Sequence, residues 1–163
     1  MNQSGSTSAV NKSVRTILWA GLVAGILDAL AAMTMTIIRG GKDPLAVWRY
    51  VASGVFGQEA LAGGTPMVAW GLIFHFFIAL TFAAVYYLIY PQLHRFISSP
   101  VTIGLFYGIL IWLVMNRIVL PLSNIPAPTQ PFDPAKVAIG MAIIMVMVGL
   151  PISLIVHRHY SGR

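Results

Sequence analysis

Two ionisable side chains lie in the middle of long apolar segments, where a charge is costly unless it is paired or hydrated. Asp28 is the one charged residue in the apolar stretch 16–38, and His75 lies near the middle of the stretch 67–90. A carboxylate and an imidazole in such positions can relay protons or coordinate a solute. They can equally form a structural contact that fixes helix packing. We expect Asp28 and His75 to be the intramembrane polar centre, in one of these two roles.

The depths of these two residues in the bilayer are compatible with contact. If the two stretches are antiparallel helices, Asp28 and His75 differ in depth by roughly 5 Å at about 1.5 Å per residue. A direct or water-bridged contact is therefore feasible. Asp28 shares a helical stripe with small residues, which predicts that it faces a neighbouring helix rather than lipid.

Further polar residues occur in the apolar stretch 101–120. Asn116 and Arg117 lie near its end, and Tyr107 lies in its middle. One interpretation is a polar vestibule formed by Asn116, Arg117 and Tyr107 together with His75. The alternative for Arg117 is that its long side chain reaches the membrane surface, because it lies about one turn from the end of the span.

Small residues recur at helical spacing on the same stretches and predict close helix contacts, because a glycine lets a neighbouring backbone approach. The predicted packing positions are Gly21, Gly25, Gly71, Gly104 and Gly108. Such stripes can serve packing within one chain or association between chains.

The elements that carry these residues are membrane spans. The chain has 163 residues, of which 58% are hydrophobic and only 9% are charged, so it is no ordinary water-soluble globule. The apolar stretches are long enough to cross about 30 Å of hydrocarbon as helices. We therefore predict an all-α polytopic membrane protein with a four-helix transmembrane domain at residues 15–158. Its spans are 16–38, 67–90, 101–120 and 137–156, which put both termini on one side.

Prolines and tails set the predicted boundaries. Pro91, Pro100 and Pro121 bracket the second and third spans, and Pro151 lies inside the fourth, where it should kink the last turns. Residues 1–14 are small and polar and are predicted to form a flexible tail. Residues 159–163 are predicted to form a short basic tail.

The long connection 39–66 contains a further helical pattern. Asp43 and Pro44 form a helix-start signal, and apolar residues recur at helical spacing over about 44–60. One interpretation is an interfacial helix that lies on the bilayer. The other is a re-entrant element that caps a cavity between the spans.

Basic residues do not decide the orientation by number. Five lie on the side of the termini, and five lie on the other side. Arg49 is about ten residues from a span and Arg117 lies within one, so both weigh less by the positive-inside rule. We therefore favour cytoplasmic N and C termini.

Several function classes receive no support. Cysteine is absent, so disulfides and thiolate metal sites are excluded. No nucleophile lies beside a base, so we expect no catalytic residues, no enzymatic activity, no metal site and no cofactor. The net charge of +6 comes from residues at span ends and in connections, which is typical of contact with lipid headgroups, and we expect no nucleic-acid binding.

Four segments together resemble small bacterial four-helix membrane proteins of unknown function. These segments are VASGVFGQEALAGG (51–64), GLIFHFFIA (71–79), GLFYGILIW (104–112) and MNRIVLPLS (115–123). The resemblance covers most of residues 16–123. It implies a bacterial inner-membrane location and the same four-helix plan, but no activity.

Two functions are compatible with this pattern. The first is an interaction, accessory or self-assembling membrane component, whose partners are the lipid bilayer, a second copy or other membrane proteins. The alternative is an oligomeric channel or a proton or solute transporter component that uses Asp28 and His75.

Overall fold

The chain folds as an all-helical bundle in the computed structural model, which describes residues 3–126 and 133–162. Four helical segments in these ranges are long and apolar enough to cross a membrane, so the predicted all-α, four-span fold is confirmed. These segments are Val10–Ile38, Thr65–Phe96, Pro100–Leu122 and Pro134–Ser161.

The first span is α1 (Gln3–Ile38), and two short helices, α2 (Ala46–Phe56) and α3 (Glu59–Ala62), precede the second span, α4 (Thr65–Phe96). The third span consists of α5 (Pro100–Val114), the π-helical turn η1 (Met115–Val119) and α6 (Leu120–Leu122). The fourth consists of α7 (Pro134–Ile144), the π-helical turn η2 (Met145–Gly149) and α8 (Leu150–Ser161).

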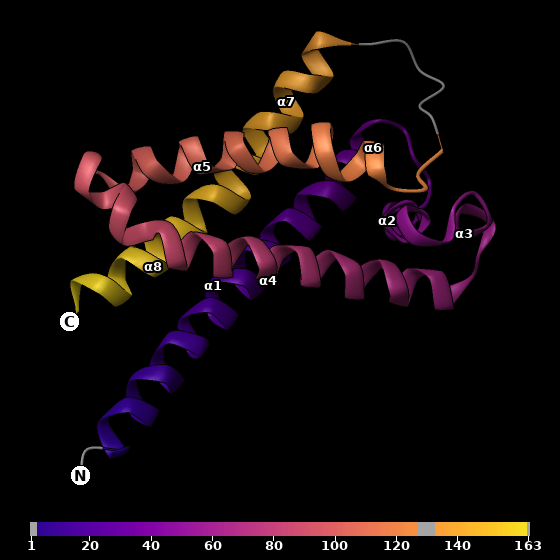
Figure 1. The fold of residues 1–163 in the computed structure, drawn as a ribbon. Coiled ribbons are helices and arrows are strands. Elements are labelled where there is room, and N and C mark those ends of the chain that lie inside the picture. The colour runs from indigo at the N-terminus through magenta and orange to yellow at the C-terminus, as the bar shows by residue number, and fades with distance from the viewer. Residues whose placement is uncertain (1–2, 127–132, 163) are drawn as a thin grey trace.

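The start of α1 and the end of α8 lie at the same end of the bundle (Figure 1). A hydrogen bond of 2.8 Å between Thr16 Oγ1 and His159 Nδ1 joins the two helices there. The short helices α2 and α3 lie at the opposite end, beside α6 (Figure 1). This arrangement agrees with the prediction that both ends of the chain lie on one side.

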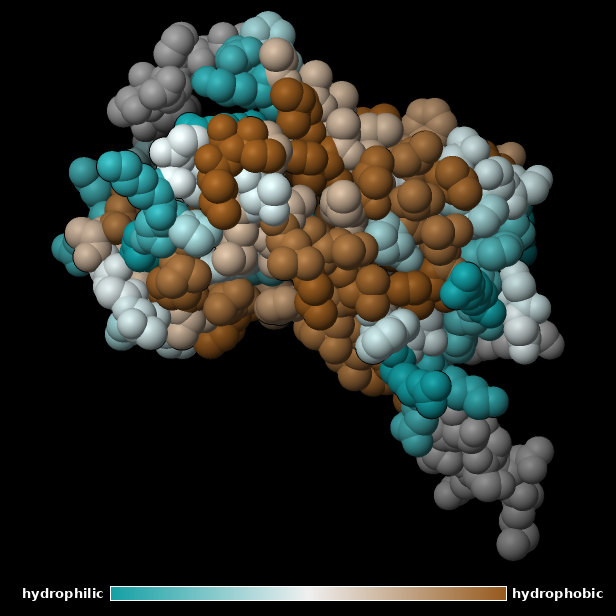
Figure 2. Space-filling view, turned by 180° about the vertical axis from the view of Figure 1, so that it is seen from behind, coloured by the Kyte–Doolittle hydropathy of each residue, from teal (hydrophilic) through white to brown (hydrophobic). Residues whose placement is uncertain are grey.

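The outer surface of the bundle is apolar between two hydrophilic ends. Figure 2 shows a hydrophobic band across the middle of one face, with hydrophilic residues on either side of it. Large apolar side chains are exposed on the outer surface: Phe77 is 68% exposed and Leu88 is 69% exposed. Such a surface is stable in lipid rather than in water.

The core is packed most tightly in the half of the bundle near the termini. Tyr86, Tyr90 and Ile152 are fully buried there. The Tyr86 hydroxyl lies 2.6 Å from Oγ of Ser153, and that Oγ donates to the carbonyl of Pro100 at 2.6 Å. These bonds satisfy polar groups in a region without water, where an unpaired group would be costly.

Pro100 begins α5, as its predicted role as a bracket requires, whereas the other two bracketing prolines lie within helices. Pro91 and Pro121 lie inside helices that continue beyond them, to Phe96 and Leu122. Pro121 and Pro151 each follow a π-helical turn, η1 and η2, in which the N–H of Leu120 or Leu150 donates to the carbonyl five residues earlier. We attribute these turns to the proline ring, because the wider π turn relieves its clash with the preceding turn. A π turn thus precedes Pro151, and the kink predicted for the last turns of the fourth span stays a prediction.

Within the described residues, helices continue into both predicted tails. Residues 3–14, predicted as flexible, continue α1, and residues 159–161 continue α8. Once a long apolar helix has formed, adding residues at its end costs little, so polar residues extend it. Residues 1–2 and 163 lie outside the described ranges.

The connection after α1 folds as the sequence indicates, with a shifted start. Asp43 accepts the N–H of Leu45 at 2.8 Å and forms an ion pair with Arg49. The helix begins at Ala46 rather than near Pro44. Gly57, with φ of 68°, ends α2 and allows the short α3 to follow.

Candidate intramembrane polar site

A cavity of about 290 Å³ lies in the middle of the bundle. Its walls come from all four spans and from α2. Three polar side chains reach it, those of Asp28, His75 and Asn116, and most of the rest of the wall is apolar. A mostly apolar pocket with a few polar groups is the usual form of a binding site for a small molecule.

His75 is held in place on α4 by α1 and α2. Its Nε2 lies 2.9 Å from the carbonyl oxygen of Gly25. A carbonyl can only accept, so Nε2 donates in this bond and Nδ1 takes no part in it. The indole of Trp48 packs edge-on against the imidazole, with ring centroids 5.2 Å apart. Two fixed contacts thus orient the ring.

The carboxyl group of Asp28 has a different environment. Among the described residues, the ion pairs are Arg49–Asp43 and Lys136–Asp133, and neither includes Asp28. No hydrogen bond to its carboxyl group occurs in that part of the chain, whereas it lies within electrostatic range of His75. The structure therefore brings Asp28 and His75 together across one cavity without a direct ion pair between them.

A second pocket, also of about 290 Å³, lies on the other side of Asp28. It is lined by Thr36 and Arg39 at the C-terminal end of α1, and by Val47 of α2. Asp28 borders both spaces. Asp28 thus borders open space on two sides. One pocket lies at the bundle centre, and the other lies toward the end of the bundle that carries α2.

Helix α2 contributes to the wall of the central cavity through Val51. The segment after α6 holds α2 in place through two hydrogen bonds. The backbone N–H of Asn124 donates to the carbonyl of Gly54, and its Nδ2 donates to the carbonyl of Val55, each at 2.9 Å. On the other side, α2 packs on α4 at Gly71, where any Cβ would overlap the backbone of Trp48. Helix α2 thus packs against the spans and lines the central cavity.

The predicted vestibule is only partly assembled. Asn116 lines the cavity, and its Nδ2 donates to the carbonyl of Trp112 at 2.9 Å. Arg117 is exposed and does not line the cavity. Tyr107 is buried in the core, where its hydroxyl donates to the carbonyl of Phe82 at 2.7 Å. Arg117 and Tyr107 are therefore not vestibule residues.

All of the predicted packing glycines lie at close helix contacts. On α1, a Cβ at Gly21 would lie 2.7 Å from Cδ2 of Leu80, and one at Gly25 would lie 2.8 Å from Cε1 of Phe76. Gly71 faces the backbone of α2. The remaining two, Gly104 and Gly108, face the backbone of η2 and α8.

Sequence reasoning missed one packing position. Gly149 lies against α5, and a Cβ there would be 2.7 Å from the backbone nitrogen of Gly108. Ser153, four residues later, contacts Gly104. The spacing of four between these two small residues is the pattern that should have revealed the contact.

A cluster of aromatic and imidazole side chains near the termini was also missed. The Tyr90 hydroxyl lies 2.6 Å from Nδ1 of His157, and the Tyr87 hydroxyl lies 3.0 Å from Nε2 of His159. The Tyr90 ring stacks on that of His94 with centroids 5.3 Å apart. The spacing of four between Tyr90 and His94 was a signal in the sequence. The partner residues on α8 lie too far along the chain to be found by spacing.

Two carboxyl groups outside the spans are held in their charged forms. The hydrogen bond from Arg49 lowers the pKa of Asp43, with a further contribution from the Leu45 N–H. Backbone hydrogen bonds from Lys136 and Ala135 lower the pKa of Asp133, which is the N-cap of α7. These groups organise the connections rather than the cavity.

Residues 3–126 and 133–162 contain no group of three or more His, Asp or Glu side chains that could hold a metal ion. Comparison with protein-family models, with curated proteins and with solved structures finds no match. The site must therefore be interpreted from its own geometry.

Proposed function

We propose that the protein is a multi-pass membrane component that carries protons, or a small cationic solute, through the cavity at Asp28. The observation that carries this proposal is the placement of the Asp28 carboxyl group. It lies in the middle of a span, borders two cavities and has no hydrogen-bond or ion-pair partner within the described residues. A proton or a cation that enters the cavity would supply the missing partner.

His75 would act as the second proton-binding group. Its Nε2 is engaged by the carbonyl of Gly25, and Nδ1 is the atom left to exchange a proton. An imidazole is suited to this role because its charge changes near neutral pH. Asp28 and His75 border the same cavity, so a single water molecule or solute there can interact with both.

An interaction or self-assembly function has less support from the geometry. That interpretation depended on stripes of small residues as surfaces for other chains. Gly21 and Gly25 are covered by α4, and Gly104 and Gly108 are covered by η2 and α8 of the same chain. These stripes are therefore occupied by internal packing and are not free to bind a partner.

We propose a bacterial inner-membrane location, because four sequence segments resemble bacterial membrane proteins. We also propose that both termini lie in the cytoplasm. Lipid would be the main partner. Because four spans are few to enclose a solute path, a second copy of the chain would complete it. We propose a non-enzymatic role, because no nucleophile lies beside a base in the sequence.

The test is a flux assay in liposomes that contain the purified protein and a pH-sensitive dye. Wild type should dissipate an imposed proton gradient, or a gradient of one cation from a panel, faster than empty liposomes. Asp28→Asn should reduce the flux to the empty-liposome rate. Glu59→Gln, which removes an exposed carboxyl group far from the cavity, should leave it unchanged. Equal flux through wild type and Asp28→Asn would overturn the proposal, as would no flux for any ion tested.

A further inference from the structure

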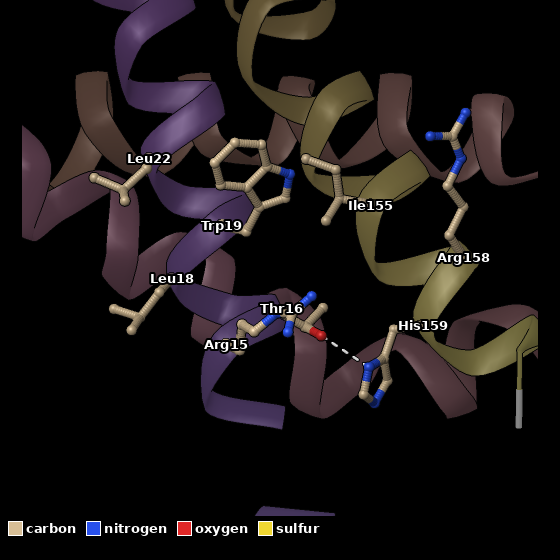
Figure 3. A pocket seen from close by; sticks show the side chains of 8 residues that line it. All are labelled: Arg15, Thr16, Leu18, Trp19, Leu22, Ile155, Arg158 and His159. Atoms are coloured by element: carbon tan, nitrogen blue, oxygen red, sulfur yellow. Dashed lines mark hydrogen bonds between the residues drawn. The ribbon is translucent and has the colours of Figure 1, made fainter. Parts of the chain in front are cut away.

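A separate pocket lies at the other end of the bundle, near the termini, and plays no part in the proposed transport path. It has a volume of about 670 Å³ and lies between α1 and α8. Figure 3 shows Trp19 from α1 and Ile155 from α8 on its two sides. The hydrogen bond between Thr16 and His159 joins the two walls below them.

The pocket has an apolar part and a basic part. Leu18, Trp19, Leu22 and Ile155 form the apolar part, and Trp19 is 61% exposed. The basic part consists of the exposed Arg15 and Arg158, one on each helix, together with His159. Arg15 and Arg158 take no part in the ion pairs of the described residues.

The charges at this end of the bundle are of one sign. The chain has four acidic residues, and all of them fall within residues 28–133, at Asp28 or in the connections at the opposite end. The ends of α1, α4 and α8 near the termini carry Lys12, Arg15, Arg95 and Arg158. Within the described residues, no Asp or Glu side chain forms an ion pair with either pocket arginine.

We propose that this pocket binds an anionic glycerophospholipid. Its phosphate would lie with Arg15 and Arg158, because guanidinium groups bind phosphate oxygens through paired hydrogen bonds. Its acyl chains would lie along Trp19, Leu22 and Ile155, which face the hydrocarbon. A tryptophan one turn inside a basic residue is typical of the level at which headgroups meet acyl chains. Basic pockets between membrane helices bind anionic headgroups in this way.

This inference is independent of the proposed transport function, because the pocket shares no lining residue with the cavity at Asp28. Its consequence is structural. The lipid would join the first and last spans at the end where the Thr16–His159 bond already links them, and so would stabilise the closed bundle.

The test measures lipid binding to the purified protein by native mass spectrometry and by the thermal unfolding midpoint. Dioleoylphosphatidylglycerol should bind and raise the midpoint, whereas dioleoylphosphatidylcholine should do so much less. Arg15→Gln and Arg158→Gln should each weaken phosphatidylglycerol binding by about fivefold, which corresponds to about 1 kcal/mol per basic residue at a charged surface. Arg15→Lys should lose less, because the charge remains.

Two controls separate this site from general attraction. Arg95→Gln removes a charge at the same end of the bundle but outside the pocket, and it should leave binding unchanged. Glycerol 3-phosphate, which carries the charge without acyl chains, should not reproduce the effect of the lipid. The proposal is overturned if both lipids bind equally, if Arg95→Gln weakens binding as much as Arg15→Gln, or if glycerol 3-phosphate stabilises the protein as well as the lipid does.

Discussion

Gly149 offers a quantitative test of the packing between the third and fourth spans. A Cβ at this position would lie 2.7 Å from the nitrogen and 2.8 Å from the Cα of Gly108, and would also overlap the carbonyl oxygen of Gly104. All three are backbone atoms, which cannot move aside as a side chain can. Overpacking of a core costs about 1–3 kcal/mol, and a backbone obstacle favours the upper end of that range.

The expected effect of Gly149→Ala follows from two opposing contributions. Replacing glycine by alanine in a helix stabilises it by about 1 kcal/mol, and the overlap costs about 3 kcal/mol, so a net loss of about 2 kcal/mol is expected. Gly140→Ala on the same span is the matched control. A Cβ there has as its nearest neighbour Nε1 of Trp112 at 3.8 Å, which is an ordinary contact. This variant should be stabilised by about 0.5–1 kcal/mol.

The free energy of unfolding can be measured by titrating the protein from mild detergent micelles into sodium dodecyl sulfate, with far-ultraviolet circular dichroism as the signal. The difference between the two variants should be about 3 kcal/mol, from the sum of the two effects above. If Gly149→Ala is as stable as Gly140→Ala, the close contact between α5 and η2 is absent and the packing argument fails.

Three further predictions concern other parts of the chain. Asp28→Asn and His75→Gln should each destabilise the protein in detergent, and a double-mutant cycle should give an interaction energy of about 0.5–3 kcal/mol, whereas strict additivity would show that the two sites are independent. Hydrogen bonding lowers the pKa of Asp133 in the folded state, so its stabilising effect is present above the ordinary pKa of 3.8 and is lost as the pH falls through the lowered pKa. Asp133→Ala should therefore lower the unfolding midpoint more at pH 7 than at a pH below 3.8, and an equal loss at both would contradict the capping role. Single cysteines at Ser98 and Gln58, in a chain with no native cysteine, should be labelled from opposite sides of the membrane, with Ser98 inside, and labelling of both from one side would contradict the four-span topology.

The fold was largely predictable because apolar length and small-residue spacing are local properties of the sequence. The stripe of Gly21 and Gly25 predicted a close contact, and the structure supplies α4 as the partner. Helix ends were less predictable. Pro91 was taken as an end signal, but α4 continues to Phe96, since one missing N–H does not stop a helix whose neighbouring turns are packed.

The site was predictable only where depth in the membrane decides the outcome. Asp28 and His75 lie at similar depths on adjacent spans, and the structure brings them to one cavity. The direction in which a side chain points around the helix axis was less predictable. Arg117 and Asn116 are neighbours in the π turn η1, but Arg117 is exposed whereas Asn116 lines the cavity. Spacing rules for an α-helix do not predict the position of such a turn.

The role of α2 could not be decided from its pattern. An amphipathic helix has the same periodicity whether its apolar face meets lipid or closes a cavity. The structure shows Trp48 and Ala52 buried against the bundle while Val55 and Phe56 are exposed. That distinction depends on the contact at Gly71, which lies on a different helix and was not linked to α2 by any sequence signal.

The most direct test of the central claim is whether water reaches position 28. Asp28→Cys should react with a small, charged, membrane-impermeant methanethiosulfonate reagent in liposomes, because the pockets at Asp28 admit water and allow the thiolate to form. Leu30→Cys, two residues away at a side chain that is 58% exposed on the outer surface, should not react. If Asp28→Cys is as unreactive as Leu30→Cys, position 28 is dry, and Asp28 is a structural contact rather than a transport group.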